Sequence, residues 1–95
     1  MINDYNKMGY NIIYCKEIDD YIEDYLKKEN AQLLVKSGFN YVVKIGQIEW
    51  RIFKIHDGQK ARRAFRIKVD SRIEEPIVNE VIKPMLLQNG EIEKF

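Results

Sequence analysis

Residues 41–54 decide the fold, and they read Tyr-Val-Val-Lys-Ile-Gly-Gln-Ile-Glu-Trp-Arg-Ile-Phe-Lys. Large apolar residues alternate with polar ones on both sides of Gly46-Gln47, which is typical of two half-buried strands joined by a tight turn. If these two residues form the turn, Val43 lies opposite Trp50 and the large apolar side chains share one face. The stretch therefore predicts an antiparallel hairpin.

A third alternating stretch, residues 65–69, follows Asp57-Gly58, which is a strong signal for a two-residue hairpin turn. This turn places Phe65 opposite Trp50 and completes a three-stranded antiparallel meander with one apolar face. The second and third strands outrun the first, so residues 54–62 are expected to project as a basic hairpin. The polar face is expected to carry a row of opposite charges across the three strands, made of Lys44, Glu49 and Arg66.

Helices are predicted on either side of the meander. Apolar residues recur at helical spacing from Ile18, so residues 17–29 are expected to form a helix that ends near Asn30 or continues to Ser37. A second helix is expected to begin at a capping box at Ser71 and to end or kink near Lys83, before Pro84. Its apolar stripe is wide enough to serve as a dimer interface.

The expected fold is α+β: a three-stranded antiparallel meander with a protruding basic hairpin, flanked by an N-terminal and a C-terminal helix. All 95 residues are expected to form a single domain, with residues 1–9 as a loose segment. Residues 10–15 are β-prone, and residues 91–95 form a short strand or a tail. A winged helix is the alternative, if residues 30–38 form a separate helix.

The net charge of +1 conceals a polarised chain. Residues 31–72 carry ten basic and three acidic residues, whereas the segments before and after them are each acidic. A basic hairpin fits a nucleic-acid groove, and its Lys and Arg side chains release counterions from phosphates. The sequence therefore predicts a non-enzymatic nucleic-acid-binding protein that favours double-stranded DNA over RNA. The expected contact residues are Arg51, Lys54, His56, Gln59, Lys60, Arg62, Arg63, Arg66 and Lys68.

The alternative function is that of a small inhibitor or adaptor of the phage or plasmid type, which binds another protein through an acidic, tyrosine-rich helix. Tyrosines and carboxylates alternate along residues 17–29 in a way that can imitate a nucleic acid or dock on a basic partner. The residues that would make this surface are Asp19, Asp20, Tyr21, Glu23, Asp24 and Tyr25.

Composition limits the other possibilities. A single cysteine, Cys15, excludes an intrachain disulfide, and a single histidine excludes paired-histidine metal motifs. No cofactor, metal or catalytic residue is expected. The apolar runs are too short to span a bilayer and no secretory signal is visible, so a cytoplasmic protein is expected. A homodimer is expected because a module of this size buries little surface on nucleic acid.

Overall fold

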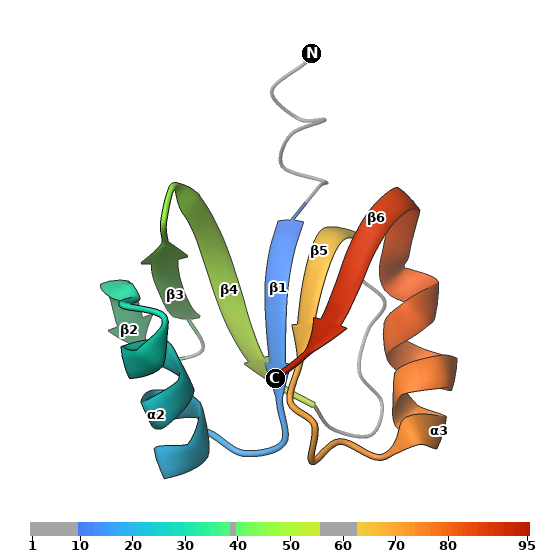
Figure 1. Cartoon of the computed structure of the whole chain (residues 1–95), viewed down its shortest axis with the longest axis horizontal. Helices are drawn as coiled ribbons and strands as arrows, with labels where there is room; N and C mark the ends of the chain where they lie inside the picture. The colour runs from blue at the N-terminus through green and yellow to red at the C-terminus, as the bar shows by residue number, and fades with distance from the viewer. Residues whose placement is uncertain (1–9, 39, 56–62) are drawn as a thin grey trace.

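The computed structural model describes residues 10–38, 40–55 and 63–95 and shows a mixed sheet with a helical segment on each face (Figure 1). These residues form six strands in the order β2-β3-β4-β1-β5-β6, which confirms the α+β class. The strands are β1 (Tyr10–Cys15), β2 (Gln32–Ser37), β3 (Asn40–Ile45), β4 (Ile48–Lys54), β5 (Ala64–Val69) and β6 (Leu86–Lys94). The helical segments are α2 (Asp20–Lys28) and α3 (Glu75–Ile77), which continues through a π turn (Val78–Ile82) and a 3-10 turn (Lys83–Met85).

The predicted hairpin of residues 41–54 is confirmed as β3 and β4. Val43 pairs with Trp50 and Lys44 with Glu49, as the alternation indicated. Gly46 in the turn has a φ of +62°, a conformation that glycine adopts without a steric cost. The meander is nevertheless β2-β3-β4, because the residues that follow α2 form the antiparallel neighbour of β3.

The strand predicted over residues 65–69 is confirmed as β5, but its predicted place as the third strand of the meander, next to β4, is wrong. β1 lies between β4 and β5 and runs parallel to both, so that Ile13 is level with Ile52 of β4 and with Lys68 of β5. Parallel strands cannot be joined by a two-residue turn, so β4 and β5 do not form the predicted hairpin and Phe65 does not face Trp50. The hairpin tip, residues 56–62, lies outside the described residues.

Burial of β1 explains why the local turn signal fails. Ile12, Ile13, Tyr14 and Cys15 are all fully buried, and alternate residues enter cores on opposite faces of the sheet. A strand that is apolar on both faces gains most at the centre of a sheet, between two parallel neighbours. A β4–β5 hairpin would leave this strand at an edge.

The first helix is shorter than predicted. α2 begins after Asp19, whose side chain accepts a hydrogen bond from the backbone N–H of Tyr21, and its C-cap is Glu29. Asn30 then adopts a positive φ of 56°, which stops the helix. The extension to Ser37 is wrong because residues 32–37 form β2, and the winged-helix alternative fails for the same reason.

The last helix begins later than predicted. Ser71 lies in the loop after β5, and α3 begins at Glu75, so the capping box does not form. Pro84 lies in the terminal 3-10 turn, and the chain becomes extended after Met85, close to the predicted end at Lys83. The expected strand or tail of residues 91–95 is the second half of β6.

Two cores hold the sheet between its helices. One core joins β1, β4 and β3 to α2 and contains Trp50, Ile52 and Leu26. The other joins β1 and β5 to the α3 segment, and it buries the stripe of Val78, Ile82 and Met85 that was expected to make a dimer contact; half-buried Phe53 and Ile55 pack against it. None of the helices in residues 10–38, 40–55 and 63–95 has the length and apolar character that crossing a bilayer requires.

Candidate functional site

Among the residues that the structure describes, the basic side chains predicted to bind nucleic acid lie on both faces of the sheet. Lys54 and Lys68 lie in register with Cys15 and Ile13 of the α2-side core, whereas Arg51 lies in register with Ile12 on the α3 side. The predicted charge row is also broken, because Arg66 stands beside Asn11 of β1 rather than beside Glu49. Arg63 is exposed just before β5. Four further predicted residues lie outside the described residues: His56, Gln59, Lys60 and Arg62.

Two of these cations form ion pairs within the chain. Lys54 Nζ lies 3.1 Å from Glu17 Oε1, and Lys68 Nζ lies 3.1 Å from Glu93 Oε1. Burial alone would lower the pKa of Lys68, but hydrogen bonding to Tyr25 and Glu93 raises it above its ordinary value. Lys68 is therefore held charged inside the fold, and it contributes less to a phosphate-binding surface than the sequence suggested.

Side chains of the acidic helix α2 also form contacts within the chain. Glu23 Oε2 accepts hydrogen bonds from Tyr41 Oη at 2.8 Å and Lys36 Nζ at 3.3 Å. The ring of Tyr25 stacks on Phe95, with 4.0 Å between the ring centroids. Asp20 and Asp24 are exposed, so they are the carboxylates of α2 best placed to meet a protein partner.

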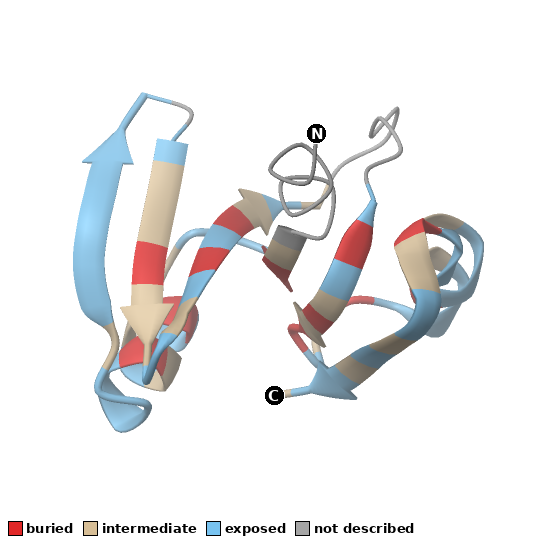
Figure 2. Cartoon of the chain, turned by 90° about the horizontal axis from the view of Figure 1, so that it is seen from above, coloured by how far each residue is buried: buried red, intermediate tan, exposed pale blue. Residues whose placement is uncertain are grey.

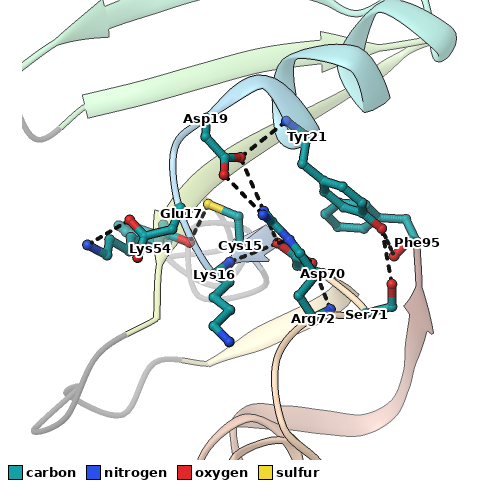
Figure 3. A network of polar contacts seen from close by, with 11 residues as sticks. Cys15, Lys16, Glu17, Asp19, Tyr21, Lys54, Asp70, Ser71, Arg72 and Phe95 are labelled. Atoms are coloured by element: carbon teal, nitrogen blue, oxygen red, sulfur yellow. Dashed lines mark hydrogen bonds and ion pairs between the residues drawn. The ribbon is translucent and has the colours of Figure 1, made fainter.

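A network of polar contacts closes the carboxyl end of the parallel strands (Figure 3). Asp70 is fully buried, and its carboxylate accepts hydrogen bonds from the backbone N–H of Lys16 at 2.9 Å and from the Arg72 guanidinium. The same guanidinium donates to Asp19 at 3.0 Å. Tyr21 Oη donates to the terminal carbonyl of Phe95, which also accepts from the backbone N–H of Ser71. The network therefore joins the loop after β1, the loop after β5 and the chain end.

The charges of this network stabilise one another. Burial would raise the pKa of Asp70, but hydrogen bonds from Arg72 and from the Lys16 N–H lower it below its ordinary value. The hydrogen bond from Arg72 likewise lowers the pKa of Asp19. Burial, with a smaller contribution from Asp70, raises the pKa of the Cys15 thiol to about 12, so this cysteine is not a nucleophile near neutral pH. Although ligands of parallel sheets often bind at this end, the groups here are engaged with one another.

An exposed aromatic side chain marks the other end of β5. Ala64 pairs with Tyr10 and Arg66 with Asn11, so Phe65 is an extra residue in the strand. The register towards β6 shifts at the same place. A bulge of this kind turns a side chain out of the regular alternation. Phe65 is 40% exposed, and the Arg66 guanidinium carbon lies 5.3 Å from its ring centroid.

Gly90 of β6 allows the bulge to form. A Cβ atom added at Gly90 would lie 2.7 Å from the carbonyl oxygen of Phe65 and 2.9 Å from that of Leu87. Both contacts are with backbone, which has little freedom to move aside. The close approach of β6 at this position therefore requires a glycine.

A groove of about 380 Å³ lies beside this bulge on the α2 side of the sheet. Trp50 forms part of its wall, and Lys68 Nζ lies 5.2 Å from the Trp50 ring centroid. Two cations and two carboxylates line it, so its charges balance. The remaining lining residues are Ile45, Ile48, Arg66, Ile67, Lys68, Glu91, Ile92 and Glu93.

Sequence reasoning missed Phe65 as a surface residue because the bulge reverses its side. Phe65, Ile67 and Val69 alternate regularly in the sequence, and only the latter two are buried. A signal was present in Gly90, because a glycine inside a strand often marks a close approach of another backbone, and the structure places it in β6 beside the bulge. Within the described ranges, no group of three or more His, Cys, Asp or Glu side chains is arranged to hold a metal ion.

Comparison of the chain with known protein families, curated proteins and solved structures finds no match. The function must therefore be argued from the residues and their arrangement.

Proposed function

We propose that the protein binds nucleic acid without acting as an enzyme, and that the bulge of β5 is its central contact. The observation that carries the proposal is the exposed Phe65 ring, which lies next to the Arg66 guanidinium and two residues after the exposed Arg63. An exposed aromatic ring among arginines is the usual means of stacking a base while binding the adjoining phosphates.

The charge of the segment supports this function. Residues 31–72 carry ten basic and three acidic residues, so a polyanion is attracted to this part of the chain. The positive charge of Lys54 and Lys68 is offset by Glu17 and Glu93. The arginines of β5 and of the residue before it are therefore the preferred phosphate contacts.

The arrangement favours nucleic acid with unpaired bases. The prediction of duplex DNA depended on a β4–β5 hairpin that would enter the major groove, and β4 and β5 run parallel. A single exposed ring stacks on a base only where that base is not already stacked in a helix. Single-stranded DNA or RNA is accordingly the proposed ligand, and duplex DNA is the comparison.

The test is fluorescence anisotropy with short labelled single-stranded and duplex oligonucleotides, in DNA and RNA forms, over a range of salt concentration. We expect binding to single strands that weakens steeply with salt, and Phe65→Ala should weaken it about tenfold because stacking contributes about 1–3 kcal/mol per base. Phe65→Tyr should bind as the parent does, since the ring is kept.

The matched control is Ile18→Ala, which removes an apolar side chain of similar exposure, 43%, at a distant site. Reversing the charge of Arg63 and Arg66 together should abolish binding. Absence of binding to every oligonucleotide at low salt would contradict the proposal. If binding to a protein partner is then lost in an Asp20→Ser, Asp24→Ser variant, the acidic helix is the functional surface instead.

A further inference from the structure

The outer strand of the sheet, β2, ends the strand order and has an edge that makes no strand pair within the described residues. All six of its residues are exposed, as Figure 2 shows along the whole length of the strand. Leu33, Leu34 and Val35 are 57%, 39% and 42% exposed, and a long apolar edge of this kind is a site for pairing with another strand.

A bulge gives β2 an unusual distribution of side chains. Leu33 pairs with Val43 and Val35 with Val42, so Leu34 is an extra residue. Leu33 lines the hollow on the α2 side, and the alternation of side chains along an extended chain then places Leu34 on the opposite side, together with Val35. Leu33 and Lys36 lie together on the α2 side, where both line a small hollow of about 150 Å³. The strand therefore presents residues 33 and 36 on one face and residues 34 and 35 on the other.

We propose that two copies of the chain pair through β2, as antiparallel strands related by a twofold axis. In the register that we infer, Leu33 lies opposite Lys36 of the second copy and Leu34 lies opposite Val35 of the second copy. Opposed residues of an antiparallel pair share a face, and this register is the one in which both pairs do so. The two sheets then join into one.

The pattern of faces selects a second copy over an unrelated strand. A regular strand alternates its side chains, so it cannot match two consecutive residues that lie on the same side. An identical strand in the opposite direction carries the same pair at the same place. Because the contact is isologous, it closes as a dimer and leaves neither β2 edge free for a third copy.

Charge is consistent with this contact. Lys36 is the charged residue of β2, and its Nζ lies 3.3 Å from Glu23 Oε2 and 4.8 Å from the Tyr41 ring centroid. In the inferred register the two Lys36 side chains stand opposite leucines and not opposite each other. The other end of the sheet differs, because β6 carries Glu91, Glu93 and Lys94, charges that protect an edge from pairing.

The first test is sedimentation velocity over a range of protein concentration, with the parent chain and two variants. The parent should be a dimer, and Val35→Lys should be a monomer. Lys36 is paired with Glu23 on the α2 side, whereas each new charge would lie on the opposite face of the sheet, against Leu34 of the second copy. Ile18→Lys, at a site of matching exposure, should remain a dimer. A monomeric parent at every concentration, a dimeric Val35→Lys or larger open assemblies would each overturn the proposal.

The second test fixes the register by disulfide crosslinking. When Leu33→Cys and Lys36→Cys variants are mixed under mild oxidation, a heterodimeric crosslink should form. Either variant alone should crosslink poorly, because equal positions in the two copies are separated by three residues, roughly 10 Å, beyond disulfide reach. Cys15 is buried and does not compete. Efficient crosslinking of one variant with itself, or no crosslink in the mixture, would overturn this register.

Discussion

The two ends of the parallel strands β1, β4 and β5 differ in how they use their polar groups. At the carboxyl end, Asp70, Arg72 and Asp19 bind one another and the backbone, and they join the loop after β1 to the loop after β5. At the amino end, a bulge exposes Phe65 beside Arg66, and a groove lies next to it. The end at which parallel sheets most often bind ligands is the one that holds this fold together.

This difference assigns stability to one end and binding to the other. Disturbing a buried carboxylate that accepts several hydrogen bonds is costly, because it leaves a buried charge or its partner without compensation. Removal of the Phe65 ring should cost the fold less than loss of a fully buried group, because 40% of the residue is already exposed to solvent. Substitutions in the Asp70 network should therefore change folding, whereas substitution of Phe65 should change binding.

The largest expected effect is at the carboxyl end of the parallel strands, in the Asp70 network. Asp70→Asn should lower the free energy of unfolding near neutral pH by about 3 kcal/mol, because Arg72 loses its buried ion-pair partner and keeps the more exposed Asp19. Chemical denaturation followed by circular dichroism measures this loss. Oligonucleotide binding by the folded variant should be unchanged, since the bulge lies at the other end of β5.

The pH dependence of the same variant provides the control. The pKa of Asp70 is lowered on folding, so its contribution is present above its ordinary value of 3.8 and is lost as the pH falls through the folded value. The parent should therefore lose stability in acid faster than Asp70→Asn, and the gap between them should narrow below pH 3.8. A constant gap down to the acid transition would show that the charge of Asp70 contributes nothing.

Much of the fold could be predicted wherever contacts are local. The β3–β4 hairpin and its register followed from alternation and one glycine, and the bounds of β1 are those of the predicted β-prone segment. The place of β1 between β4 and β5 could not be predicted, because pairing between distant strands depends on burying both faces of β1 and not on any turn.

Bulges account for much of what the sequence concealed about the candidate sites. A bulge at Leu34 removes the alternation that would have identified β2, and a bulge at Phe65 moves an apparent core residue to the surface. The cation partners were hidden for another reason, since Glu93 lies far from Lys68 in sequence and meets it only because β6 pairs with β5.

The second-largest expected effect concerns Gly90, which supports the Phe65 bulge at the amino end of the parallel strands. Gly90→Ala should destabilise the fold by about 1–3 kcal/mol, because the new methyl group would press on the carbonyl oxygens of Phe65 and Leu87. It should also weaken oligonucleotide binding, since relief of the contact moves the bulge. Gln88→Ala, at an exposed position of the same strand, should change neither quantity. Normal binding by a stable Gly90→Ala variant would show that the bulge geometry is irrelevant to the ligand.

The smallest expected effect concerns a single buried polar atom at the groove, Trp50 Nε1. Trp50 in the groove wall is 5% exposed, and within the part of the chain that the structure describes its Nε1–H has no hydrogen-bond partner. An unsatisfied buried donor costs about 1–3 kcal/mol, which Trp50→Phe would recover. The smaller ring leaves a cavity that costs a similar amount, about 24 cal/mol for each Å³. We therefore expect a net change below about 1 kcal/mol by thermal and chemical denaturation.

Ile52→Ala is the matched control for Trp50→Phe, because Ile52 is buried in the same core and has no polar atom. Its truncation should cost about 2–5 kcal/mol, with nothing to offset the cavity. If Trp50→Phe proves equally costly, the buried indole N–H does not destabilise the fold. The polar groups at the amino end of the strands would then be as well satisfied as those at the carboxyl end. If the two variants differ as expected, the unpaired indole N–H is a cost that the fold tolerates at the groove, away from the Asp70 network.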